Sequence, residues 1–592
     1  MNVRTNLTQS RSARWPTALL ALAALSGGSW IIYVAVTLSG QSLYEEGTGD
    51  HSLLTVLGLF ALAFVLYLMS LRAALCAVQD NRLLMVIVVA AVVFRLTMLF
   101  SDPIEEIDLY RYLWDGVATT SGVNPFRYSP DQVLAATGTD PLPEDLARLT
   151  ARRDGSSEVE TVLRHVHFGE LPTIYPPVSQ VVFAAATALM PSDACLWARM
   201  VVMKAVFVGF DLGTVFILLR LLTFVGKPIG WSVAYAWCPL VLKEFANSGH
   251  LDALAVFLTT LSVYFAVRAL YSEGEPCSST HRMKSLVAAS FFLALAVGAK
   301  FYPVVLAPLL FGAALRQLGW RNAAASFAVF LVGVVVVTWP MWPRESAASR
   351  EVIQHQVASA ELPPLPPSEP STEPQDPSHS LRTFLSQWEM NDFLFLILVE
   401  NLRPNVEAQP HDVAWFSIVP ETWRHKVIGL AVNQFRIDPG QAPFFLSRVV
   451  VSIVFIGIAA TFAYQALRAR QATAWLESAF LTLAWFWLLL PTLNPWYWTW
   501  ALPLLPFARN KAWFAVSGLV FVYYLRFWLV HHYATASVFG TRYSGALFFD
   551  YVVTWIEFAT WFVWLWSAWM LRRRTPNIVG LNPRHEQQVA LS

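Results

Sequence analysis

The chain has 592 residues, of which 56% are hydrophobic and only 14% are charged, and its formal net charge is +1. With a mean hydropathy of +0.48, this composition argues against a soluble enzyme and offers no basic surface for nucleic acid. Apolar runs near the length that a helix needs to cross a bilayer recur along the sequence. We therefore predict an all-α polytopic membrane protein with about 12 to 14 transmembrane helices.

The flanking arginines predict the orientation of the chain. Arg4, Arg11 and Arg14 precede the first apolar run, and Arg572 to Arg574 follow the last one. Because Lys and Arg concentrate on the cytoplasmic side, we expect a multi-pass protein of the inner (plasma) membrane with both termini cytoplasmic. The first run is long and lacks a small-residue cleavage site, so we interpret it as a signal anchor.

This orientation predicts two large extracytoplasmic loops between groups of transmembrane helices. The second loop contains the proline-rich stretch that starts at Glu361. The predicted segments are N-terminal helices (1–100), a first loop with catalytic acids (101–172), central helices (173–342), the proline-rich second loop (343–443), C-terminal helices (444–575) and a cytoplasmic tail (576–592).

The number of crossings in the central segment is left open by the sequence. Runs 174–190 and 197–222 cannot both cross if the turn near Lys227 is cytoplasmic, so one of them is re-entrant. Alternatively, 286–315 is one long broken helix rather than two short ones. The charge bias favours the first arrangement.

The first loop holds an unusual set of acids beside a bilayer, in SDPIEEIDLYRYLWDG from Ser101. A helix over 103–116 would place Glu105, Asp108, Tyr112 and Asp115 on one face, with Arg111 beside it. Carboxylates and an arginine supply the base and the phosphate-binding cation that sugar transfer needs, and the rings stack on a pyranose. From spacing alone, an amphipathic surface helix with internal salt bridges explains the pattern equally well.

Further polar residues interrupt later apolar runs. His250 and Asp252, in NSGHLDALAV, are suited to binding sugar hydroxyls or a phosphate, or else form a capped interfacial pair. Lys300, in GAKFYP, is interpreted as a phosphate ligand. Trp496 and Tyr497, in NPWYWTW, form a wall for sugar or prenyl chain or, more commonly for such rings, part of an interfacial belt.

Two other functions compete with an enzyme. A transporter or lipid flippase would use Lys204, Asp211, Asp252 and Lys300 as an ion relay, but no inverted repeat accompanies them. Lys204 and Asp211 lie two helical turns apart, which favours a structural charge pair. A scaffold subunit would fit the proline-rich loop and leave the first-loop acids unexplained.

Several motifs together resemble a known superfamily. IDLYRYLWDG followed by SGVNPFRYSP is similar to the first extracytoplasmic loop of bacterial GT-C glycosyltransferases, which are polytopic enzymes that use polyprenyl-phosphate sugars. Within that superfamily the chain looks like the polyprenyl-phosphomannose-dependent mannosyltransferase-like proteins. TIYPPVSQVVF, NSGHLDALAV, GAKFYPVVLAPLLF and LNPWYWTWALPLLPF extend the resemblance over most of the chain.

The resemblance implies a GT-C fold and transfer of a hexose, with mannose expected, from a polyprenyl-phosphate donor to an extracytoplasmic glycan or glycolipid, with inversion. Asp108 matches the acid of the family's first loop and is expected to be the general base, with Glu105 supporting or replacing it. The doubled Glu105-Glu106 departs from the simpler acidic pair of relatives and leaves the identity of the base open among the three.

The other predicted site residues bind substrates. Arg111 and Lys300 are expected to hold the donor phosphate, and His250 with Asp252 to position sugar hydroxyls, while membrane lipid surrounds the enzyme. We predict no cofactor and no metal, with a divalent cation in the acidic cluster as the alternative.

Overall fold

The computed structural model describes residues 15–39, 53–136, 142–191, 193–271, 279–342, 374–405 and 413–574. Within these ranges the elements are helical, and the only β pairing is an isolated bridge between Met390 and Thr492. The predicted all-α architecture is confirmed. The predictions that rest on Arg4, Arg11 and Arg14, on most of the proline-rich stretch and on the tail 576–592 fall outside the described residues.

Ten stretches of the described chain are long and apolar enough to cross a membrane, so the chain is a multi-pass membrane protein. They comprise α2 (Trp15–Ser39), α3 (Leu53–Cys76), α4 (Asn81–Leu99), α10 (Leu196–Phe224), α13 (Asp252–Leu270), α14 (Ser279–Ala299), α16 (Trp320–Thr338), α21 (Ala442–Arg468), α24 (Ala512–Leu519) with α25 (Leu525–His532), and α26 (Gly545–Phe548) with α27 (Thr554–Arg574).

The helices of the central segment favour the first of the two predicted arrangements. Helix α9 (Pro177–Ala188) has 12 residues and extends about 18 Å, well short of the roughly 30 Å hydrocarbon core. Helix α14 ends at Ala299, and after a short η3 (Tyr302–Leu306) the chain continues into α15 (Ala307–Leu318). Because the start of α14 and the end of α15 line one cavity, these two helices run antiparallel and are not one broken helix.

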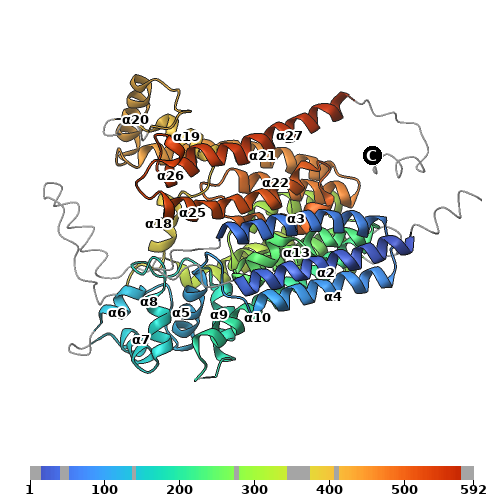
Figure 1. Cartoon of the computed structure of the whole chain (residues 1–592), viewed down its shortest axis with the longest axis horizontal. Helices are drawn as coiled ribbons and strands as arrows, with labels where there is room; N and C mark the ends of the chain where they lie inside the picture. The colour runs from blue at the N-terminus through green and yellow to red at the C-terminus, as the bar shows by residue number, and fades with distance from the viewer. Residues whose placement is uncertain are drawn as a thin grey trace, which may run out of the picture.

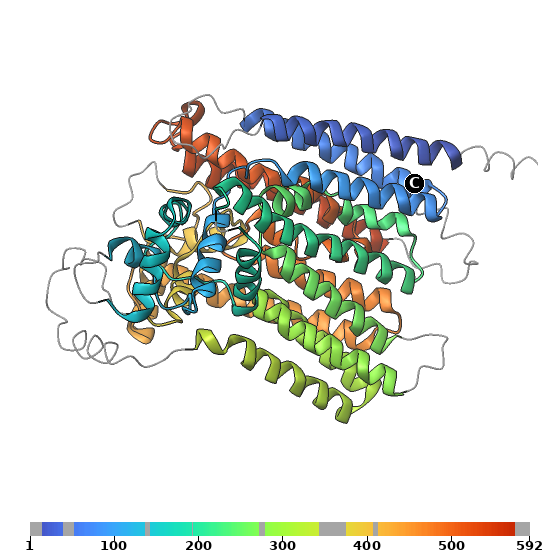
Figure 2. The same ribbon diagram turned by 90° about the horizontal axis from the view of Figure 1, so that it is seen from below.

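The helices of both large loops gather at one end of the bundle (Figures 1 and 2). The backbone N–H of Gln375 donates to the carbonyl of Arg127 at 2.7 Å, and the rings of Trp388 and Phe168 lie 4.7 Å apart. The second loop therefore packs directly on the first. The helices concerned are α5 (Asp108–Thr120), α6 (Pro130–Ala135), α7 (Glu144–Asp154), α8 (Ser157–Arg164), α18 (His379–Gln387), α19 (Leu394–Leu402) and α20 (Glu421–Phe435).

A buried ion pair joins α4 to α10 and corrects one sequence-based interpretation. Arg95 donates to both carboxylate oxygens of Asp211, at 2.6 and 3.1 Å, and both side chains are fully buried. Lys204 instead donates to the carbonyl of Ser101 at 2.6 Å. The predicted Lys204–Asp211 pair is wrong, because a guanidinium from the neighbouring helix binds the carboxylate in a bidentate manner that an ammonium does not match.

Close packing on α9 fixes the position of α5. A Cβ atom on Gly116 would lie 2.7 Å from the carbonyl oxygen of Phe183 on α9, so only glycine allows this approach. The stacked rings of Tyr112 and Phe183, 4.7 Å apart, extend the contact toward the start of α5. The first residue of α5 is thus presented from a rigid element and not from a free loop.

Candidate active site

Helix α5 begins at Asp108, not near Pro103 as predicted. The preceding residues are irregular: Glu105 has a positive φ of 48°, and Asn247 holds the turn by accepting from Ile104 N at 3.0 Å and donating to the Asp102 carbonyl at 2.7 Å. These bonds to the bundle satisfy backbone groups that a helix would have used. Glu105 therefore does not share a helix face with Asp108.

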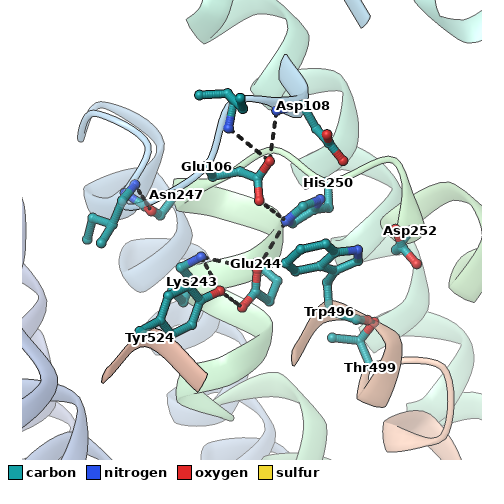
Figure 3. A network of polar contacts seen from close by, with 12 residues as sticks. Glu106, Asp108, Lys243, Glu244, Asn247, His250, Asp252, Trp496, Thr499 and Tyr524 are labelled. Carbon is teal, nitrogen blue, oxygen red and sulfur yellow. Dashed lines mark hydrogen bonds and ion pairs between the residues drawn. The ribbon is translucent and has the colours of Figure 1, made fainter. Parts of the chain in front are cut away.

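Glu106 caps the start of α5 (Figure 3). Its Oε1 accepts the backbone N–H groups of Ile107 at 2.9 Å and Asp108 at 2.7 Å. A carboxylate at this end of a helix is favoured by the helix dipole. The other oxygen, Oε2, lies 3.1 Å from Nε2 of His250, so the acid joins α5 to the chain segment before α13.

His250 lies between two carboxylates. Its Nε2 is 3.2 Å from Oε2 of Glu244 as well as 3.1 Å from Glu106, and its ring stacks on Trp496 with centroids 4.3 Å apart (Figure 3). Burial alone would lower the pKa of His250, but Glu106 and Glu244 outweigh it and raise that pKa above its usual range. The two carboxylates therefore favour the protonated imidazolium form of His250.

The same pairing acts on Glu106 in the opposite sense. Burial alone would raise its pKa, but the charge of His250, the hydrogen bond to it and the backbone N–H of Asp108 outweigh burial and hold the pKa of Glu106 below its usual range. The ionised form of Glu106 is thus favoured, and its charge is already matched by His250.

A second buried ion pair supports His250 from below. Lys243 and Glu244 belong to the π-helix η2 (Leu242–Asn247), and their Nζ and Oε2 atoms are 3.3 Å apart. The Tyr524 hydroxyl donates to Oε1 of Glu244 at 2.7 Å. Sequence reasoning missed Lys243 and Glu244, although two adjacent charges inside the apolar run YAWCPLVLKEFANSG are a signal that intramembrane ionisable residues often carry.

Asp252 and Lys300 form the third buried pair. Nζ of Lys300 donates to both oxygens of Asp252 at 2.7 Å, and Nε1 of Trp500 donates to Oδ1 at 2.5 Å. The ammonium also lies 4.3 Å from the centroid of the Tyr497 ring. Lys300 sits one residue beyond the end of α14, where the helix break turns its side chain toward the start of α13.

Asp108 differs from these acids because it forms no ion pair with any described residue, although a ring nitrogen of His250 lies within 4.8 Å of its carboxylate. Its Oδ2 accepts a hydrogen bond from the Tyr175 hydroxyl at 2.9 Å and a longer one from Tyr112 at 3.5 Å. Burial, reinforced by the charge of Glu106, raises the pKa of Asp108 to about 6, against the opposing effects of His250, Tyr175 and Lys300. Asp108 is partly exposed, and its carboxylate is the one among these acids that no ion pair prevents from accepting a proton.

The structure brings most of the predicted site residues into contact, whereas three of them form no hydrogen bond or ion pair with the others among the described residues. Arg111 donates to the carbonyls of Leu171, His167 and Phe168 at 2.9 to 3.1 Å. Asp115, two helical turns after Asp108 on α5, accepts a hydrogen bond from Gln180 at 2.9 Å. Glu105 makes no hydrogen bond with another described residue, and burial raises its pKa to about 7. The residues that converge are Asp108, Tyr112, His250, Asp252, Lys300, Trp496 and Tyr497.

Three of the groups also have the spacing of a metal site. Ligand atoms of Glu106, Asp108 and His250 lie within 4.8 Å of one another, and carboxylate with imidazole suits several divalent ions. A metal would have to displace the proton that His250 holds between two carboxylates, because only a neutral imidazole coordinates.

Comparison with known proteins found one family. Residues 15–316, about half of the chain, match the model described as alpha-(1->6)-mannopyranosyltransferase, N-terminal domain. This range contains Asp108, His250 and Lys300, whereas Trp496 and Tyr524 lie beyond it. No curated protein and no solved structure gave a match.

We predict that the cluster functions without a metal. Protein dialysed against an excess of chelator should keep its melting temperature, and metal analysis should find well below one divalent ion per chain. A stoichiometric ion that is retained by the wild-type protein and lost in His250→Gln would contradict this prediction.

Proposed function

The chain belongs to the alpha-(1->6)-mannopyranosyltransferase family, and from that premise we propose that it takes mannose from a polyprenyl-phosphate donor and transfers it to a hydroxyl of a glycan or glycolipid acceptor. Membership makes the chain a membrane glycosyltransferase of the mannosyltransferase class. The donor, the acceptor and the stereochemistry are the proposed parts. A donor with a prenyl tail is supported by a site at the end of a bundle of membrane-spanning helices.

The observation that carries the mechanism is the charge state of the cluster. Glu106, Glu244 and Asp252 each contact a cation, so they are poor bases. Asp108 accepts only tyrosine hydroxyls and has a pKa of about 6, which is close to the operating pH that general base catalysis favours. We assign Asp108 as the base, with Glu105 as the alternative.

The proposed reaction is a single displacement. The Asp108 carboxylate takes the proton of the acceptor hydroxyl while that oxygen forms a bond to the anomeric carbon of mannose. The bond between the anomeric carbon and the phosphate oxygen breaks, and its electron pair leaves with the polyprenyl phosphate. Attack from the opposite face inverts the anomeric centre, and no covalent sugar–enzyme intermediate is needed.

The leaving phosphate requires a cation, and Lys300 is placed to supply it. It lies close enough to Asp108 to lower the pKa of that carboxylate, and its charge is shared with Asp252. Arg111 is less well placed, because its guanidinium donates to three loop carbonyls. The rings of Trp496 and Tyr497 offer stacking surfaces for the sugar.

We propose that the site faces outward from the plasma membrane and that both termini are cytoplasmic. The start of α2 and the end of α27 lie at the end of the bundle opposite the two loops, which supports this orientation (Figure 1). The transporter alternative is disfavoured, because two residues of the proposed ion relay have structural partners: Lys204 donates to a backbone carbonyl and Asp211 pairs with Arg95.

We predict that Asp108→Asn abolishes most of the activity. Loss of a positioned base typically costs about 10²–10⁴-fold, so transfer from radiolabelled polyprenyl-phosphomannose to membrane-extracted acceptors should fall by that factor in reconstituted protein. Glu105→Gln, three residues away and without a hydrogen bond to any described residue, is the matched control and should lose less than tenfold. Full activity in Asp108→Asn, with loss in Glu105→Gln, would transfer the role to Glu105.

The hydrogen bond from Tyr175 to Asp108 leads to a separate prediction about how the transfer rate depends on pH. The base must be ionised, so the rate should fall tenfold per pH unit below about 6 in the wild-type enzyme. Tyr175→Phe removes a donor that stabilises the carboxylate, which raises the pKa of Asp108. The pH below which the rate falls should therefore rise by about one unit. Tyr112→Phe, whose hydroxyl lies farther away at 3.5 Å, should shift it less. If the pH at which the rate falls is unchanged in both variants, Asp108 is excluded as the titrating group.

A further inference from the structure

A cavity of about 370 Å³ opens at the end of the bundle away from the candidate active site. Helix α13 starts at Asp252 in the site and has 19 residues, so its last turn lies about 28 Å away. The cavity is formed there by the ends of α13, α15 and α21 and the start of α14. Its lining residues are Leu270, Tyr271, Arg282, Arg316, Gln317, Leu467, Arg468, Ala469 and Arg470.

The lining is strongly basic. Four of its nine residues are arginines and none is acidic. Among the residues that the structure describes, no carboxylate forms an ion pair with any of these four guanidinium groups. Like charges gathered in one hollow are costly unless an anion shares it.

Two of the arginines are held in place by helix ends. Arg282 donates to the carbonyls of Ala269 and Leu270 at 2.8 and 3.2 Å, and Arg316 donates to that of Leu467 at 3.0 Å. Each guanidinium has five N–H donors, so these bonds orient the group and leave other donors for a ligand. The side chains are thus preorganised.

Helix capping does not account for the whole charge. Three helix C-termini and the N-terminus of α14 meet here, and with roughly −0.5 of an elementary charge for each C-terminus and +0.5 for the N-terminus they amount to about −1 together. Four guanidinium groups carry +4, so among the residues that the structure describes an excess of about +3 remains. A phosphate group, with its fork-shaped match to guanidinium, has the charge and geometry to balance it.

The surroundings favour a lipid over a soluble anion. Leu315 on α15 and Tyr464 on α21 precede the lining residues Arg316 and Leu467 by one and three positions and are 53% and 52% exposed. Farther along α21, Ile456 and Ile453 are 66% and 64% exposed, on a helix that is long and apolar enough to cross the membrane. An acyl chain can lie along this surface while its headgroup occupies the cavity.

We infer that this cavity binds the phosphate headgroup of an anionic phospholipid of the bilayer leaflet opposite the active site. The inference does not depend on the proposed sugar transfer, since none of the lining residues belongs to the candidate active site.

The test measures binding of a short-chain phosphatidylglycerol to the full chain in detergent, by the shift in melting temperature across a titration. Phosphatidylglycerol should raise the melting temperature, whereas phosphatidylcholine of the same chain length and inorganic phosphate should not. Arg468→Gln with Arg470→Gln, which leaves both capping arginines intact, should weaken the apparent affinity roughly tenfold or more.

Arg321→Gln is the matched control, because Arg321 is an exposed arginine at the same end of the bundle that does not line the cavity. It should bind phosphatidylglycerol as the wild-type protein does. Equal affinity of the double variant and the control, or an equal shift with phosphatidylcholine, would overturn the proposal. A shift that inorganic phosphate reproduces in full would replace the lipid by a soluble anion and would equally overturn it.

Discussion

The ion pair between Glu106 and His250 determines where the chemistry of this protein is placed. Glu106 accepts the backbone N–H groups of Ile107 and Asp108, at the start of α5, with one oxygen and contacts His250 with the other. Without that contact, the turn before Asp108 would be held to the bundle only by the hydrogen bonds nearer its start, such as those of Asn247, and the buried His250 would face Glu244 alone. Removing one partner of a buried pair commonly costs about 3–5 kcal/mol, so the turn, the helix start and the charge state of the cluster depend on one another.

Both halves of the chain contribute to this arrangement. The family match ends at residue 316, yet Trp496 stacks on His250, Tyr524 donates to Glu244, and Trp500 donates to Asp252. The second loop also reaches the site: the ring of Tyr523 lies 6.3 Å from that of Trp496, and its hydroxyl lies 3.1 Å from the sulfur of Met390. The C-terminal helices therefore act as the wall that excludes water from the buried pairs, and low dielectric strengthens those pairs.

The sequence predicted the architecture better than the pairing of charges. Hydropathy and arginine placement are local properties of single runs, and they led to an all-α membrane protein with two loops at one end. Spacing placed Asp108, Tyr112 and Asp115 on one helix, as observed, but it extended that helix back to Pro103, because the bonds from Asn247 to residues 102 and 104 come from a distant segment. Lys204 and Asp211 were paired by spacing for the same reason, whereas Arg95 on another helix takes the carboxylate. Contacts with distant segments decided both the start of α5 and the partner of Asp211, and the spacing of residues along one segment cannot predict such contacts.

The most direct test of the account is the structure of the Asp108→Asn variant with a polyprenyl-phosphate mannose bound, determined by cryo-electron microscopy in a lipid nanodisc. The account predicts that the mannose lies between residue 108 and Trp496, with its anomeric carbon turned toward residue 108 and its phosphate at Lys300. A donor bound with its sugar near Asp115 or Arg111 and its phosphate away from Lys300 would contradict the assignment of Asp108 as the base.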